Sequence, residues 1–193
     1  SNSNVVKKVA LPTEAFPTAT VFSNLVHFIL ALSMLTIFIV GYMIFGDPKV
    51  VPNWEVIFLP LIIIVQTLIL IGLSLIISSL NVYYRDIGSI TEIVLTAWFY
   101  LTPVIYPTQL AREQLKEIVP GNWLYYLYLC NPLTPIVVGY RRVLYGRYLS
   151  KAPEVSDQTL LIGLGIALLV GIVVFWIGTK VFQRYSGGFA DEL

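Results

Sequence analysis

The chain has 193 residues, of which 57% are hydrophobic and only 12% are charged, and its formal net charge is +1. A soluble globular protein carries about 25% charged residues, so the composition excludes that class and indicates a membrane protein. The near-neutral charge provides no basic surface for nucleic acid. The single cysteine, Cys130, excludes an intrachain disulfide and a cysteine-rich metal site.

Residues 1–19 combine two adjacent lysines, Lys7 and Lys8, with two prolines and Glu14. The pattern predicts a short helix at the membrane surface, followed by a bend. A basic segment beside a membrane serves as an anchor on anionic lipids or as a docking segment for a protein partner. Residue chemistry alone does not decide between the two roles.

Apolar runs long enough to cross about 30 Å of hydrocarbon follow. The predicted spans are residues 20–45, 57–80 and 159–181, with a shorter fourth span at 87–106. Four spans place both termini and residues 81–86 on one side, and the loops near 46–56 and 107–158 on the other. The expected fold class is therefore an all-α integral membrane protein.

Lysine and arginine are most frequent in cytoplasmic loops, and this bias normally sets the orientation. The side with the termini carries Lys7, Lys8, Arg85, Lys180 and Arg184, whereas the other carries Lys49, Arg112, Lys116, Arg141, Arg142, Arg147 and Lys151. The raw count leans toward termini outside the cytoplasm, and it does not decide the orientation.

A polar turn containing Tyr84, Arg85 and Asp86 separates the second and third apolar runs. Each charge costs a few kcal/mol at a bilayer centre, so the turn is expected at the water interface. On residue chemistry alone an ordinary interhelical turn is the better interpretation.

The third apolar run carries Glu92, which lies about 9 Å deeper than Asp86 if the run is helical. It is either a hydrated carboxylate near the membrane surface or part of the entrance to a polar pathway. Farther along, Trp98, Phe99 and Tyr100 form an interfacial aromatic belt or line a conduit in which a glycan slides over their apolar faces. We take these four residues as candidates for the conduit.

Residues 107–158 begin with a polar, amphipathic stretch and become apolar again between 123 and 145. The apolar part is too short for a further span and is interrupted by Asn131, Pro132 and Pro135. Two re-entrant half-helices fit this pattern better. In the last span, Gly163, Ala167 and Gly171 are spaced four apart, which predicts close packing against another helix.

Several motifs together resemble a known family. They are K-K-V-x-x-P-x-E-x-x-P at 7–17, N-V-Y-Y-R-D-I and W-F-Y-L-T-P-V-I-Y-P within 81–107, Y-x-x-x-x-N-P-L-T at the start of 126–141, and F-A-D near the end. This set is similar to the permease subunits of ABC exporters for cell-surface polysaccharides, the O-antigen and teichoic-acid type. The resemblance covers nearly the whole chain.

The resemblance implies roles for these motifs. Residues 1–19 are expected to be a cytoplasmic coupling segment that docks on an ATPase subunit, through Lys7, Lys8, Val9, Pro12 and Glu14. Residues 107–158 are expected to form an extracytoplasmic gate with Tyr126, Asn131, Pro132, Pro135 and Arg141. The turn with Arg85 and the tail 182–193 then lie in the cytoplasm. The amino-terminal part of the family fold, a gate helix and two earlier spans, is expected to be missing.

The function implied is a multi-pass permease of the bacterial inner membrane that exports lipid-linked polysaccharide. Its expected partners are a second copy of itself, two nucleotide-binding ATPase subunits and membrane lipids. The sequence contains no G-x-x-x-x-G-K phosphate loop, so ATP and Mg²⁺ are expected in the partner, with no cofactor or metal in this chain. The alternatives are a membrane-embedded transferase of glycan assembly, which needs convergent acids or metal ligands, and a non-transporting scaffold.

Overall fold

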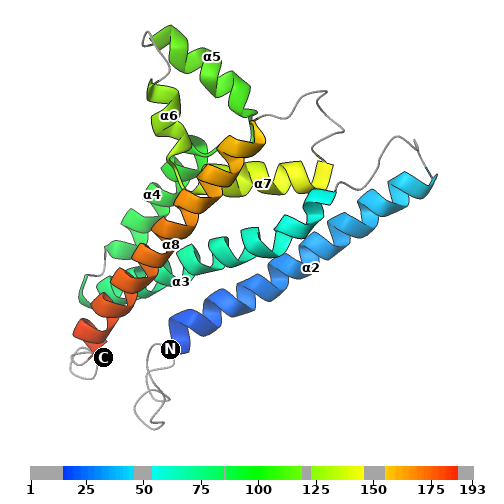
Figure 1. Cartoon of the computed structure of the whole chain (residues 1–193). Coiled ribbons are helices and arrows are strands. Elements are labelled where there is room, and N and C mark those ends of the chain that lie inside the picture. The colour runs from blue at the N-terminus through cyan, green and yellow to red at the C-terminus, as the bar shows by residue number, and fades with distance from the viewer. Residues whose placement is uncertain (1–14, 46–53, 85, 119–122, 146–154, 187–193) are drawn as a thin grey trace.

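The computed structural model describes residues 15–45, 54–84, 86–118, 123–145 and 155–186, and it is helical throughout these ranges apart from short turns (Figure 1). Three helices are long and apolar enough to cross a membrane: α2 (Ala15–Phe45), α3 (Leu59–Tyr83) and α8 (Asp157–Ser186). At about 1.5 Å per residue, the shortest of them is about 37 Å long and exceeds the hydrocarbon thickness. The prediction of an all-α integral membrane protein is confirmed.

Helices α3 and α8 form the centre of the bundle because small residues let their backbones approach closely. A Cβ atom added to Gly178 would lie 2.5 Å from the carbonyl oxygen of Gly72, and one added to Gly72 would lie 2.6 Å from the backbone nitrogen of Phe175. Ala167 is fully buried, and Gly171 faces side chains of α3. The predicted packing role of the small residues in the last span is confirmed, and the same contact extends to Gly178.

The apolar core lies where α3 and α8 meet α7 (Leu133–Tyr145). Its buried residues are Ile62, Val65, Ile69, Ile136, Val143, Leu164 and Ala167. A smaller cluster around Leu75 and Phe182 packs the other end of the α3–α8 pair. The core therefore joins α7 to the spans, and it fixes the position of the residues that α7 carries.

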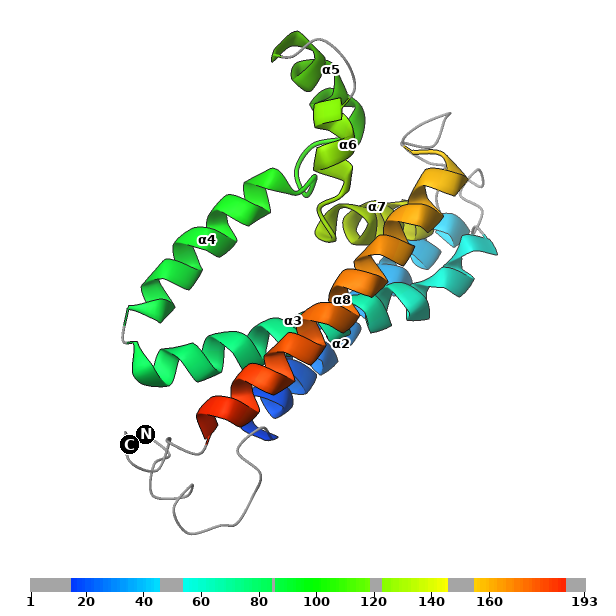
Figure 2. The same ribbon diagram turned by 60° about the vertical axis from the view of Figure 1, so that its left-hand side comes forward.

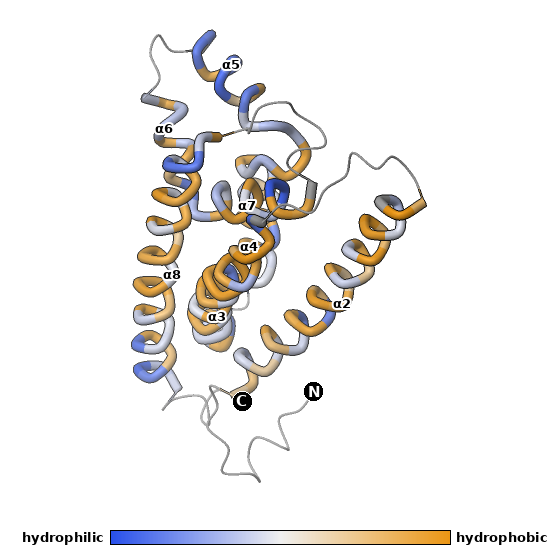
Figure 3. The backbone as a smooth tube through the Cα atoms, turned by 45° about the vertical axis from the view of Figure 1, so that its right-hand side comes forward, coloured by the Kyte–Doolittle hydropathy of each residue, from blue (hydrophilic) through white to orange (hydrophobic). Residues whose placement is uncertain are grey.

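Helix α2 packs chiefly against α3 and leaves much of its apolar surface exposed (Figure 3). Two contacts locate it: the Ser74 hydroxyl donates to the Pro17 carbonyl at 3.4 Å, and the Phe28 ring meets Tyr140 edge-on at 5.5 Å. An exposed apolar helix face of this kind is suited to lipid or to a further protein segment.

The fourth predicted span, 87–106, consists of α4 (Ile87–Leu101) and a turn over residues 102–106. The helix has 15 residues and is about 22 Å long, which is shorter than the hydrocarbon thickness by itself. It diverges from α3 after the turn that joins them (Figure 2), and none of its residues is buried. Helix α4 is thus held near its two ends rather than along its length.

The end of the bundle opposite the termini carries four short helices. These are η1 (Trp54–Phe58), α5 (Thr108–Ile118), α6 (Trp123–Leu129) and α7. The apolar stretch 123–145 is broken at Asn131 and Pro132 into two short helices, as its sequence predicts. Helix α7 lies across the end of the bundle, whereas the polar helix α5 projects away from it (Figures 1 and 3).

Candidate functional site

Asn131 connects the beginning of α7 to the end of α4. Its side-chain oxygen accepts hydrogen bonds from the Trp98 indole at 3.0 Å and from the backbone N–H of Leu133 at 3.1 Å. Its amide nitrogen donates to the Thr102 hydroxyl at 3.1 Å. A short amide side chain at this position satisfies a free N–H of the new helix, which is why asparagine favours helix starts. The same group also ties α7 to α4.

Arg141, near the other end of α7, binds the turn that follows α4. Its guanidinium donates to the carbonyl oxygens of Tyr106 at 3.1 Å, of Val104 at 2.9 Å and of Pro103. Prolines cannot donate a backbone hydrogen bond, so the turn cannot continue as a helix and its carbonyls need other partners. Arg141 provides them, and its fork of five donors suits several acceptors at once.

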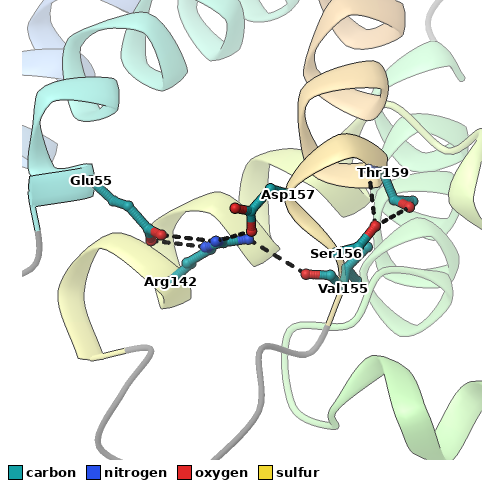
Figure 4. Close-up of polar contacts among 6 residues, drawn as sticks. All are labelled: Glu55, Arg142, Val155, Ser156, Asp157 and Thr159. Carbon is teal, nitrogen blue, oxygen red and sulfur yellow. Dashed lines mark hydrogen bonds and ion pairs between the residues drawn. The ribbon is translucent and has the colours of Figure 1, made fainter.

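Arg142, the next residue, makes a separate cluster (Figure 4). Its Nε and one terminal nitrogen each lie 2.8 Å from a carboxylate oxygen of Glu55, and it also pairs with Asp157 and donates to the Val155 carbonyl at 3.4 Å. The side chains of Arg142 and Glu55 are only 15% and 11% exposed, whereas that of Asp157 is 72% exposed. Hydrogen bonding to Glu55 raises the pKa of Arg142 above its usual value and keeps it charged.

Adjacent helical residues point about 100° apart, so the two arginines reach different neighbours. Arg141 faces the turn after α4, and Arg142 faces η1 and the start of α8. Helix α7 therefore links the far end of α4 to the α3–α8 core through side chains rather than through the chain itself. We define Trp98, Thr102, Asn131 and Arg141, with residues 103–106, as the gate junction.

The predicted conduit residues of α4 occupy different environments. The indole of Trp98 is half-buried and bound to Asn131, whereas Phe99 and Tyr100 are exposed and contact each other edge-on at 5.5 Å. Glu92 is also exposed and lies about one and a half helical turns from Trp98, toward the beginning of α4. The role of these residues in a conduit stays a prediction, for which Phe99 and Tyr100 have the accessible faces.

The predicted gate residues lie on or between α6 and α7. Tyr126 is exposed on α6, next to Tyr125, whose ring stacks on Tyr128 at 6.3 Å and faces Arg112 at 5.7 Å. Pro132 precedes α7, and Pro135 is buried in its first turn, where it packs against Gly163 of α8. Burial raises the pKa of the Tyr128 hydroxyl above its usual value.

Comparison with known proteins identifies the family. Residues 1–145 match the family model described as "ABC-2 type transporter". The chain belongs to the ABC-2 transporter family. It is 24% identical to the "O-antigen export system permease protein RfbA" of Myxococcus xanthus over 98% of the chain, and 23% identical to a Klebsiella pneumoniae protein of the same name over all of it. In both comparisons the chain spans 65% of the relative's length.

Some of the residues in the motifs given above lie outside the described residues. This applies to the predicted docking residues Lys7, Lys8, Val9, Pro12 and Glu14, and to Arg85 of the turn. The neighbours of Arg85 are described: Tyr84 directly follows α3 and its N–H donates to the Leu80 carbonyl at 2.9 Å, and Asp86 precedes α4. Their cytoplasmic placement stays a prediction.

Sequence reasoning did not single out Arg142, Glu55, Asp157 or Thr102. Glu55 and Arg142 are 87 residues apart, and no local pattern pairs them. One signal was present, because a carboxylate at the start of a long apolar run needs a partner when it is buried. The indole bond of Trp98 had no sequence signal, since an aromatic side chain near a membrane surface usually belongs to the interfacial belt.

Replacing Asn131 with alanine should loosen the gate junction while leaving the spans in place. Three hydrogen bonds are lost, and at about 1 kcal/mol each we expect a loss of roughly 3 kcal/mol in local stability, or opening that is more frequent by a factor on the order of a hundred. Amide hydrogen exchange of residues 102–106 measures this opening. Asn24→Ala is the control, because among the described residues its amide donates to the Thr20 carbonyl of its own helix and joins no other element. Equal exchange in the two variants would remove the structural role of Asn131.

Proposed function

We propose that this chain is the membrane-spanning part of a permease that exports lipid-linked polysaccharide, such as O-antigen or a similar surface glycan, across the bacterial inner membrane. The observation that carries the proposal is the similarity to O-antigen export permeases, which extends over 98–100% of the chain. The three membrane-length helices are consistent with it. ATP hydrolysis is assigned to partner subunits, because the sequence has no phosphate loop of its own.

The proposed assembly contains two copies of the permease and two ATPase subunits, with the pore between the copies. In this arrangement residues 1–19 are the coupling segment, docked through Lys7, Lys8 and Glu14, and both termini lie in the cytoplasm. The opposite end of the bundle, with α5, α6 and α7, is the extracytoplasmic gate. The arrangement of the helices supports this assignment of the two ends. The end of α3 and the end of α8 lie together, at the end of the bundle where α2 begins (Figure 1).

The attachment of α4 suggests how movement reaches the gate. The helix begins at the turn near residue 86 on the proposed cytoplasmic side and ends at the gate junction, and it packs little in between. A displacement at its beginning can therefore be transmitted to α7 without first breaking a packed core. The exposure of Phe99 and Tyr100 on this helix supports a role in contacting the glycan, whose apolar sugar faces pack on aromatic rings.

The experiment is complementation in cells that lack their own copy of the gene. The intact permease should restore surface polysaccharide and clear lipid-linked glycan that has accumulated inside. Phe99→Leu and Tyr100→Leu should each lower export severalfold at equal membrane abundance, because leucine is as compatible with lipid but offers no flat face. Export is measured as surface glycan per inserted permease.

Trp176→Leu is the matched control, since Trp176 is an exposed aromatic residue of α8, far along the chain from α4. Equal export by all three variants would contradict the aromatic conduit. A deletion strain that accumulates no lipid-linked glycan inside would contradict the export function and favour a role in glycan assembly.

A further inference from the structure

A cavity of about 90 Å³ lies beside the Arg142 cluster, between η1, α3, α7 and α8. Most of its wall is apolar, formed by Phe58, Ile62, Val143, Leu160, Leu161 and Leu164. Its polar lining consists of Glu55, Arg142 and Asp157. An apolar wall with a charged group at one edge suits an amphipathic ligand rather than a water-soluble one.

The charges at this edge do not balance. Arg142 contributes one positive charge, and Glu55 and Asp157 contribute two negative charges, so the described cluster carries one excess negative charge. Glu55 is mostly buried and held by two contacts with the guanidinium, whereas the Asp157 side chain is 72% exposed. The exposed carboxylate of Asp157 can therefore present the excess negative charge to a ligand.

The position of the edge fits the headgroup region of a membrane. Asp157 is the first residue of α8, and the long apolar part of that helix follows directly. Asp157 and Leu161 are four residues apart, so they lie on the same face of α8, and both are exposed. A membrane lipid can reach the cavity across this face with its headgroup beside Asp157.

We propose that this cavity is a binding site for a phospholipid with a primary amine headgroup, in the leaflet opposite the termini. One acyl chain inserts its upper part between Leu161 and Val143, and the ammonium group donates hydrogen bonds to the Asp157 carboxylate. The cavity is too small for a whole lipid, so the remainder lies along the exposed surface of α8. The site does not depend on which cargo the permease carries.

The charge pattern selects among lipids. An anionic headgroup without an amine is repelled by the excess carboxylate, and a trimethylated choline headgroup has no N–H to donate. A primary ammonium provides both the complementary charge and up to three donors. The bound lipid would also cover the apolar side of the ion-pair cluster and limit the access of water to it.

The test is native mass spectrometry of the intact permease released from bilayers that contain equal amounts of phosphatidylethanolamine and phosphatidylcholine with identical chains. The wild-type protein should retain the ethanolamine lipid over the choline lipid by about fivefold or more, because charge-assisted hydrogen bonds are the strong ones. Asp157→Asn should remove this preference with little change in size. Leu161→Trp should block the mouth and remove both lipids.

Leu169→Trp is the control, because Leu169 is an exposed leucine of the same helix that does not line the cavity. It should retain lipid as the wild type does. Equal retention of the two lipids by the wild type, no retained lipid at all, or an unchanged preference in Asp157→Asn would each overturn the site. Retention by Leu161→Trp at the wild-type level would place the lipid elsewhere on the protein.

Discussion

Gly178→Val should keep α8 from docking closely on α3 and strongly lower the yield and the Tm of the folded protein. The new Cβ atom would lie 2.5 Å from the Gly72 carbonyl oxygen and 3.1 Å from the Gly72 Cα. Both neighbours are backbone atoms, so no side chain can turn aside and the two helices must separate. Overpacking a core costs about 1–3 kcal/mol, and a clash with backbone belongs at the upper end of that range. The yield of monodisperse protein after detergent extraction and its Tm measure the effect.

Gly165→Val is the matched control for this variant. It makes the same change in the same helix, but a Cβ atom at Gly165 meets nothing within 4 Å. Any loss that the two variants share reflects helix propensity, and the difference between them reflects the contact with Gly72. If Gly178→Val and Gly165→Val have the same yield and Tm, the close α3–α8 contact is incorrect.

Arg142→Met should be the second strongly destabilising substitution. It leaves the Glu55 carboxylate, which is 11% exposed, without its two charged hydrogen bonds. Breaking a buried ion pair from one side costs about 3–5 kcal/mol. For a protein of this size, a loss of about 3 kcal/mol lowers the Tm by roughly 6–12 °C.

A double-mutant cycle separates the pair from the loss of side-chain volume. Arg142→Met combined with Glu55→Gln should recover much of the lost Tm, since no unpaired charge then remains buried. Arg112→Met is the control, because Arg112 lies on the projecting helix α5 and contacts only the Tyr125 ring among the described interactions. A double variant no more stable than Arg142→Met alone would show that the pair with Glu55 does not stabilise the fold.

The long spans and the break at Asn131 could be predicted from the sequence because they follow from local chemistry. A run of about 20 apolar residues has few alternatives in a bilayer, and Pro132 cannot donate the backbone hydrogen bond that would continue the preceding helix. The small residues of α8 carried a similar signal through their spacing of four. Each of these features depends on residues within a few turns of one another.

The candidate site was less predictable because its contacts are long-range. Arg141 was found only through the family motif, and nothing in its neighbourhood indicates that it binds the carbonyls of residues 103, 104 and 106. The aromatic run on α4 predicted one environment for Trp98, Phe99 and Tyr100, but the indole has a polar partner 33 residues away. The divergence of α4 from α3 depends on where α7 binds the end of α4. No sequence pattern within α4 predicts that position.

The pairing of α3 with α8 also sets the order in which the protein can be completed during synthesis. Gly72 and Gly178 are 106 residues apart (178 minus 72), and α8 is the last described helix to leave the ribosome. At a translation rate of about 5–20 residues per second, roughly 5–20 s pass between the synthesis of Gly72 and that of Gly178. The small-residue face of α3 lacks its α8 partner during this time. During that interval, lipid and the described elements that precede α8 are available to cover it. The α3–α8 contact can therefore form only after α8 has been synthesised, and a chain that stops before α8 leaves the other described helices without the partner around which they assemble.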